Sequence, residues 1–198
     1  MIDLNSLMEL DRQILAFFNG SDSLFLDGVA MTLTSALTWI PLYLGLLYIV
    51  IKNNETMAQI VLITCCVLLC LFLADGLADY IVKPLVGRWR PTNDPVIKYT
   101  IDVVNNYRET KYGFFSAHAA NTFGVAWCVI LAFRCDRKNR YGWLTAVMLC
   151  WATWVSLSRV FVGKHFLGDV LVGIAIGTAL GLAFGALARW VIRRLGWK

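Results

Sequence analysis

The sequence predicts an all-α integral membrane protein, a helical bundle of about five transmembrane helices plus an N-terminal amphipathic interfacial helix. Of the 198 residues, 59% are hydrophobic and 16% are charged, and the mean hydropathy is +0.64. This composition is too apolar for the polar surface of a soluble domain. Apolar runs near the roughly 20 residues that cross a bilayer recur along the chain. We therefore expect one membrane-embedded domain over residues 1–198.

The first predicted helix covers residues 1–20. Its apolar side chains recur at helical spacing, but charges such as Glu9 and Asp11 make it too polar and too short to span a membrane. We expect it to lie on the membrane interface. Ser6 with Glu9 resembles a capping box, and Gly20 resembles a helix stop. The segment lacks the basic start and cleavage site of a signal peptide, so we expect that nothing is removed.

Five apolar runs follow, and each is long enough to be a transmembrane span. They cover residues 25–51, 57–82, 117–133, 141–157 and 169–190. The last run contains a stripe of glycines at every fourth position, namely Gly173, Gly177, Gly181 and Gly185. Such a stripe lets a neighbouring helix approach closely, within one chain or between two. The oligomeric state stays open.

Basic segments predict the orientation of the bundle. The segment Arg134–Arg140 is dense in positive charge, and further basic residues end the chain. Both segments are expected to be cytoplasmic, which places the N-terminus outside. Because spans alternate in direction, the loop after the second span and the loop after the fourth span must lie on the same face of the membrane.

The loop after the fourth span, Ser158–Asp169, is the most informative part of the chain. It places Arg159, His165 and Asp169 between two long apolar segments. Ionisable groups at the end of a span are costly, so they indicate a functional site. His165 and Asp169 are four residues apart. If a helix starts near Phe166, the carboxylate can reach back and hold the imidazole in one tautomer.

The loop after the second span supplies matching groups on the same face. It opens near Lys83 and Arg90 and closes with Ser116 and His118 at the mouth of the third span. Together with Arg159, these residues provide three positive charges and a neutral donor. His118 is expected to face the second imidazole of the chain across the gap. Such a set suits a phosphate group, whose oxygens need several donors and whose charge needs cations.

Other classes of ligand fit the sequence less well. Cys65, Cys66, Cys70, Cys128 and Cys150 fall inside apolar runs with neither a disulfide framework nor metal-ligand spacing, and the chain has two histidines. We therefore expect no metal and no cofactor. The basic residues lie between apolar runs and not on a solvated face, so an anionic lipid within the bilayer is the expected partner and nucleic acid is not.

Three motifs carry a resemblance to a known family. They are Lys83 with Arg90 and Pro91 as K-x6-R-P, then Ser116 and His118, then Ser158, Arg159, His165 and Asp169 as S-R-x5-H-x3-D. In this order and spacing they resemble the signature motifs of the type 2 phosphatidic acid phosphatase family. The motifs span residues 83–169. The second motif departs from the usual P-S-G-H, because Phe115 replaces proline and Ala117 replaces glycine, which affects the expected phosphate geometry rather than the reaction class.

The resemblance implies a metal-independent phosphoric ester or anhydride hydrolase that works in two steps. His165 would attack phosphorus to form a phosphohistidine, with its ring held by Asp169. His118 would protonate the leaving oxygen and then activate water. The phosphate oxygens would be held by Lys83, Arg90, Ser116, the Ala117 amide and Arg159.

The resemblance leaves the substrate open. Undecaprenyl diphosphate is the first expectation, with the site on the outer, periplasmic face of a bacterial inner membrane. The alternatives are lipid A, phosphatidylglycerol phosphate and phosphatidic acid. An alternative of another class is a lipid-phosphate transporter that uses the same cations only for binding; acidic residues within spans would favour it.

Four charged residues stand outside this scheme. We expect Arg88 and Lys164 to contact lipid head groups or solvent. Asp75, Asp79 and Lys83 share one helix face, so Asp79 is expected to pair with Lys83 and Asp75 to bond to a neighbouring helix. The alternative is that the two carboxylates line a polar pocket for a substrate head group or form a proton path.

Overall fold

The computed structural model describes residues 3–19, 23–54, 56–102, 104, 110–133 and 142–196. In chain order its helices are α1 (Leu4–Asn19), α2 (Leu24–Thr34), η1 (Ala36–Trp39), α3 (Ile40–Asn53), α4 (Met57–Gly76), η2 (Leu77–Val82), α5 (Lys83–Val86), η3 (Pro91–Asn93), α6 (Ala117–Phe133), α7 (Gly142–Phe161) and α8 (Leu167–Arg194). Within these ranges four helical stretches are long and apolar enough to cross a membrane, and α6 is shorter, with 17 residues. The predicted all-α membrane class is confirmed.

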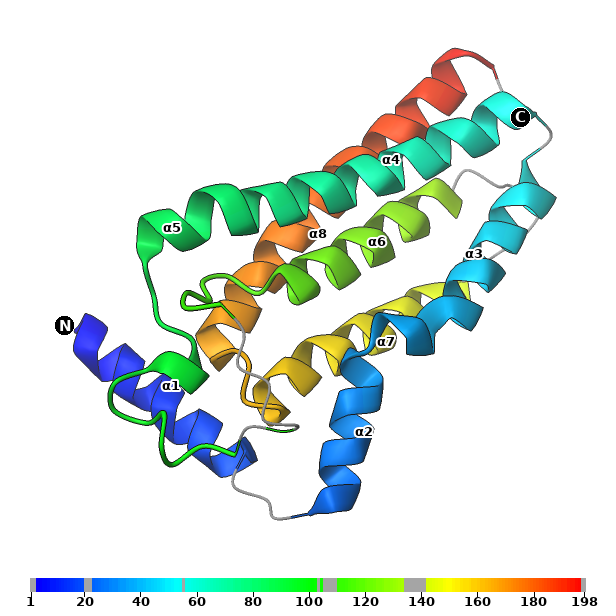
Figure 1. Ribbon diagram of the computed structural model, residues 1–198. Coiled ribbons are helices and arrows are strands. Elements are labelled where there is room, and N and C mark those ends of the chain that lie inside the picture. Colours follow the sequence, from blue (N-terminus) through cyan, green and yellow to red (C-terminus); the bar gives the residue numbers. More distant parts are fainter. Residues whose placement is uncertain are drawn as a thin grey trace.

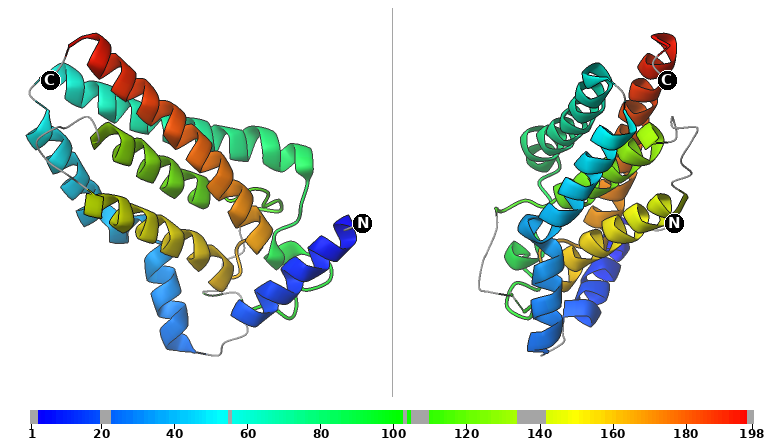
Figure 2. Two further views of the ribbon diagram at one scale, coloured as in Figure 1. Left: turned by 180° about the vertical axis from the view of Figure 1, so that it is seen from behind. Right: turned by 90° about the vertical axis from the view of Figure 1, so that its right-hand side faces the viewer.

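Helix α6 lies at the centre of the bundle, between α4, α7 and α8 (Figure 1). Most of its side chains are buried, whereas α4 and α8 expose many apolar side chains outward. Exposed apolar side chains on outer helices are expected where the surroundings are lipid. Helix α1 lies across the end of the bundle where α7 ends and α8 begins, as both views in Figure 2 show.

The glycine stripe of α8 packs directly on the backbone of α6. A Cβ atom built on Gly177 would lie 2.2 Å from the Ala120 carbonyl oxygen, and one on Gly181 would lie 2.4 Å from the Gly124 carbonyl oxygen. Both distances are far below van der Waals contact, so only glycine permits this approach. The predicted role in helix packing is confirmed, and the packing is within one chain.

The first predicted span is not continuous, and this prediction was wrong. The run from 25 to 51 divides at Ser35, whose backbone is extended (φ −77°, ψ 125°). Pro41 has no N–H to extend a helix backward and lies in the first turn of α3. The Trp39 indole N–H donates to the Leu33 carbonyl over 2.8 Å and satisfies an otherwise unpaired carbonyl at the end of α2. As a result, α2 bends away from α3 (Figure 1).

The other predicted helices are present, with shifted ends. The second span continues through η2 and α5 to Val86, and the fourth extends to Phe161. The capping box expected at Ser6 is wrong: α1 already begins at Leu4, and the Ser6 hydroxyl donates to the Asp3 carbonyl inside the first turn. Two features of the sequence prediction lie outside the described residues, namely the basic segment Arg134–Arg140 and the expected helix stop at Gly20.

We predict that Gly177→Ala lowers the free energy of unfolding by about 1–3 kcal/mol, because the new methyl group forces α6 and α8 apart. Thermal unfolding in detergent measures the change. The matched control is Gly45→Ala in α3, where a Cβ atom meets nothing within 4 Å. Alanine there should leave stability unchanged or raise it slightly, since alanine favours a helix more than glycine does. Equal effects of the two substitutions would contradict this account of the packing.

Candidate active site

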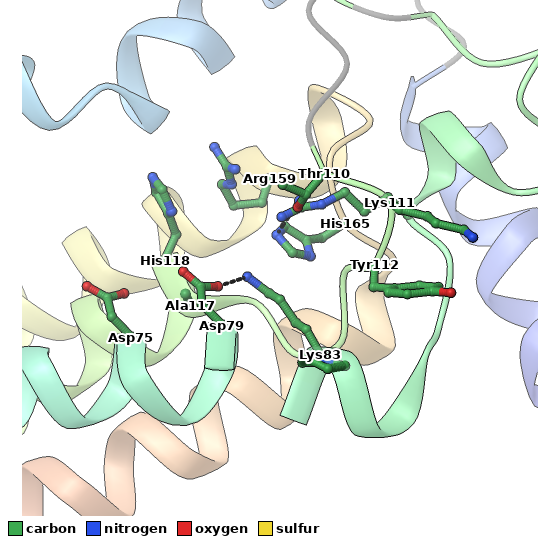
Figure 3. A pocket seen from close by; sticks show the side chains of 12 residues that line it. Asp75, Asp79, Lys83, Thr110, Lys111, Tyr112, Ala117, His118, Arg159 and His165 are labelled. Atoms are coloured by element: carbon green, nitrogen blue, oxygen red, sulfur yellow. Dashed lines mark hydrogen bonds and ion pairs between the residues drawn. The ribbon is translucent and has the colours of Figure 1, made fainter. Parts of the chain in front are cut away.

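A pocket of about 570 Å³ lies at the end of the bundle that α1 covers. Its lining comes from the end of the long α4–α5 helix, the loop that follows, the start of α6, the end of α7 and the loop before α8 (Figure 3). The lining residues are Asp75, Asp79, Lys83, Pro84, Arg90, Thr110, Lys111, Tyr112, Ala117, His118, Arg159 and His165. The loops after the second and fourth spans therefore meet on one face, as predicted.

His165 is buried, and its two ring nitrogens have different surroundings. Nε2 lies 3.1 Å from Arg90 Nη1. A guanidinium can only donate, so Nε2 accepts and the proton of a neutral ring belongs on Nδ1. Nδ1 faces Asp169 Oδ2 at 3.7 Å, which is longer than a hydrogen bond. The lone pair of Nε2 thus points toward the cationic side of the pocket.

Asp169 lies behind His165 at the start of α8 and is fully buried. Its Oδ2 accepts from the Phe166 N–H at 3.2 Å, and its carbonyl accepts from the Ser116 N–H at 3.0 Å. Its Oδ1 accepts from Arg88 Nη1 at 2.7 Å. The expectation that Arg88 contacts lipid or solvent is therefore wrong, because the guanidinium is directed inward onto the buried carboxylate.

Lys83 and Arg159, the other cations of the pocket, each have a polar partner, and only the partner of Lys83 was predicted from the sequence. Lys83 forms an ion pair with Asp79, and Asn121 Nδ2 of α6 donates to Asp75 over 2.8 Å, as predicted for the two aspartates. Both carboxylates also line the pocket. Arg159, in the last turn of α7, donates to the Thr34 hydroxyl of α2 over 2.6 Å. No sequence pattern pointed to Thr34.

The second motif is largely buried, apart from His118. Ser116 is fully buried and does not line the pocket; its Oγ accepts from the Ala119 N–H at 3.4 Å and caps α6. Ala117 does line the pocket, in the first helical turn, where N–H groups have no partner within the helix. Phe115, which replaces the usual proline, packs in an apolar cluster with residues of η2, α4 and α6. His118 is exposed on the pocket wall.

The two halves of the long loop are joined beside the site. An isolated antiparallel bridge pairs Trp89 with Tyr112, the Arg90 N–H donates to the Lys111 carbonyl over 3.1 Å, and the Gly113 N–H donates to the Arg88 carbonyl over 2.9 Å. A Cβ atom on Gly113 would lie 2.7 Å from Arg90 Cγ. This bridge orients Arg90 toward His165 and was not predictable from the motifs.

Burial and positive charge act together on His165. Burial lowers the pKa of the imidazole well below its usual range, and the charges of Arg90, Arg159 and Lys83 lower it further. A protonated ring would be a buried cation beside other cations, which is unfavourable. The ring is therefore neutral at pH 7, and this is the form that can act as a nucleophile.

The bundle and the cationic pocket at its end define a membrane protein built to handle a phosphate-like anion. The sequence matches the family model of the PAP2 superfamily over residues 63–193. The chain belongs to this superfamily of membrane lipid phosphatases and is a phosphoric monoester hydrolase. This membership favours the enzyme over the transporter alternative.

Similar proteins support the same assignment. A lipid A 4'-phosphatase of Bacteroides thetaiotaomicron is 36% identical over 96% of this chain and 81% of its own length. Another, from Porphyromonas gingivalis, is 29% identical over 88% and 71%. The fold resembles a PAP2-type phosphatidylglycerolphosphate phosphatase of Bacillus subtilis, with TM-score 0.66, 19% identity, and 94% and 88% coverage. It also resembles Aquifex aeolicus LpxE, with TM-score 0.60, 18% identity, and 88% and 94% coverage.

We predict that His165 titrates well below the ordinary histidine pKa of about 6.5. The chain has two histidines, so His118→Gln leaves a single imidazole whose NMR signals can be followed with pH. Because the folded pKa is lowered, the ring should stay neutral as pH falls through 6.5 and gain its proton only in more acidic solution. A midpoint at or above 6.5 would contradict the pocket electrostatics.

Proposed function

We propose that the protein removes a phosphate group from lipid A or a similarly built glycolipid, with His165 as nucleophile. The observation that carries the proposal is the pocket itself, where a buried neutral imidazole stands beside Lys83, Arg90 and Arg159. A phosphate monoester dianion would be stabilised by these cations and would bring phosphorus close to the ring. The reaction needs nothing beyond water as a second substrate.

In the proposed first step, Nε2 of His165 forms a bond to phosphorus while the ester P–O bond breaks. His118, protonated, gives its proton to the leaving glycolipid oxygen. Arg90 exchanges its contact with Nε2 for a phosphate oxygen, and the Ala117 amide is a further donor at the start of α6. The phosphorylated ring gains positive charge, which the Asp169 carboxylate behind Nδ1 stabilises.

In the proposed second step, His118 is neutral and takes a proton from water. The resulting hydroxide attacks phosphorus, the P–N bond breaks, and the Nε2 lone pair of His165 is restored. His118 lines the same pocket as His165, so one exposed imidazole serves both proton transfers. Ser116 supports this geometry through its cap on α6 and its N–H bond to the Asp169 carbonyl.

Two observations favour a glycolipid over undecaprenyl diphosphate, which the sequence alone had placed first. Two similar proteins are lipid A 4'-phosphatases. The carboxylates of Asp75 and Asp79 line the pocket, where they would repel a second phosphate. A sugar head group instead offers hydroxyl and amide donors that carboxylates accept well. A polyprenyl diphosphate has no such donors.

An apolar pocket of about 270 Å³ supports a lipid substrate. Side chains of α3, α4, α6 and α7 line it, including Leu46, Val67, Val125 and Trp151. Asn121 also lines this pocket, and its amide donates to Asp75 of the polar pocket. The two pockets are thus adjacent, and an acyl chain would extend from one while the head group occupies the other.

The proposed setting is a bacterial inner membrane with the pocket on the outer, periplasmic face. The chain forms one phosphatase domain in this proposal, because α1 and the motif segment 83–169 contact each other directly. The C-terminal end of α8, with Arg193 and Arg194, lies at the opposite end of the bundle (Figure 1). Basic residues are enriched on the cytoplasmic side of membrane proteins, which supports this orientation.

We predict that lipid A is hydrolysed with a kcat/KM at least about tenfold above those of undecaprenyl diphosphate, phosphatidylglycerol phosphate and phosphatidic acid, a difference of about 1.4 kcal/mol. Phosphate release in detergent, with the four lipids assayed side by side, measures it. Asp75→Ala should lower the rate with lipid A and leave phosphatidic acid unaffected. Faster turnover of undecaprenyl diphosphate would refute the glycolipid assignment.

We predict different kinetics for the two histidine variants with p-nitrophenyl phosphate, whose leaving group needs no protonation. His118→Gln should release one equivalent of nitrophenol per enzyme in a burst and then stall, because water is not activated. His165→Ala should show no burst and lose activity by about 10³-fold or more. Rapid-quench measurements separate the two. A burst from His165→Ala would remove this residue from the nucleophile's role.

A further inference from the structure

We propose that Asp11 of the interfacial helix α1 is a positioning residue of the active site and acts through Arg88 on Asp169. The inference rests on the proposed roles of His165 and Asp169. It gives α1 a part in catalysis, because α1 supplies a carboxylate that the three motifs do not contain.

The contacts form a continuous chain from α1 to the imidazole. Asp11 Oδ2 accepts from Arg88 Nη2 at 2.6 Å, and Arg88 Nη1 donates to Asp169 Oδ1 at 2.7 Å. Asp11 Oδ1 accepts from the Gly168 N–H at 3.0 Å, one residue before Asp169. Asp11 therefore holds both the guanidinium that binds Asp169 and the backbone that carries it.

Burial and charge make this arrangement necessary. The Asp169 side chain is 0% exposed, Arg88 is 17% exposed and Asp11 is 15% exposed. Burial alone favours the neutral form of a carboxyl group, and the positive charge of Arg88, which forms an ion pair with Asp169, opposes this effect. Arg88 also stacks on the Phe166 ring, with 4.7 Å from its central carbon to the ring centroid. Because Arg88 occupies Oδ1, Oδ2 remains directed at His165.

Gly168 shows how closely α1 approaches α8. A Cβ atom at this position would lie 2.6 Å from Asp11 Oδ2 and 3.3 Å from Arg88 Nη1. The first turn of α8 thus leaves room for the carboxylate and the guanidinium side by side. The Gly168 N–H is one of the first amides of α8, which have no acceptor within the helix, and it donates to Asp11 Oδ1.

Docking of α1 does not depend on Asp11 alone. Arg12 Nη2 forms an ion pair with the buried Asp94 at 3.1 Å. The Asn19 amide donates to the Phe161 and Asp102 carbonyls over 3.0 and 2.9 Å and accepts from the Asp102 N–H at 2.8 Å. Leu15 is fully buried against residues of α7 and α8. A change at Arg12 is therefore a matched control for α1 docking that leaves Arg88 and Asp169 untouched.

The test compares Asp11→Asn, Arg88→Gln, their double variant and Arg12→Ala in the full-length protein, with p-nitrophenyl phosphate as the probe. Asp11→Asn keeps an oxygen for the Gly168 N–H and removes the charge that faces Arg88. We expect kcat to fall by about 10–100-fold, by analogy with groups that orient metal-bound histidines, with KM changed less than about twofold. Arg12→Ala should keep kcat within about twofold of the parent.

The double variant distinguishes a relay from separate structural effects. If Asp11 acts through Arg88, Asp11→Asn should cost less than about twofold more in the Arg88→Gln background. The inference would be overturned if the kcat losses of the two single variants multiplied in the double variant. It would also be overturned if Asp11→Asn left kcat unchanged, or if Arg12→Ala lowered kcat as much as Asp11→Asn does. If Asp11→Asn cannot be purified folded, Asp11→Glu keeps the charge but moves it by one methylene group; it should lower kcat with KM nearly unchanged, and an unchanged kcat would overturn the inference. Asp169→Asn with full activity would overturn the proposed role of Asp169, whereas His165→Ala with full activity would overturn the proposed function itself.

Discussion

The close contact between α6 and α8 is the constraint on which the site depends. The glycines of α8 allow its axis to approach the α6 backbone so that the first turns of both helices meet. The Ser116 N–H then reaches the Asp169 carbonyl, and the segment with His118 joins the segment with His165. A larger side chain in this stripe would separate the two motif segments. The packing of α8 on α6 therefore determines the geometry of the site.

Charge organisation is the second theme. Burial and the cations that would attract a phosphate both disfavour a protonated His165, so the pocket keeps this imidazole neutral. Carboxylates form ion pairs with one cation of the pocket and with one cation behind it. Asp79 pairs with Lys83, which lines the pocket, and Asp11 and Asp169 both pair with Arg88, which lies behind His165. Each pairing orients a basic side chain that would otherwise have many rotamers. The pocket is thus preorganised before a substrate enters.

Periodicity, motif spacing and the alternation of spans were enough to predict the helices, the common face of the two loops and the residues Lys83, Arg90, His118, Arg159 and His165 as pocket neighbours. They did not predict the break at Ser35, because a run of apolar residues is as compatible with two short helices as with one long helix. Arg88 was misassigned because its partners are far away in the sequence. Thr34, Asp11 and Gly113 reach the site only through tertiary contacts, which no local pattern encodes.

The N-terminal helix has a consequence for biogenesis. Asp11 and Gly168 are separated by 157 positions in the chain, yet they share a hydrogen bond. The ribosome produces the first of them long before the last span exists, so a partly synthesised chain has no finished catalytic centre. If Asp11 has the proposed positioning role, the site is complete only after α8 has packed against α1. On that proposal, a chain would hydrolyse its substrate only after all of its helices had been inserted.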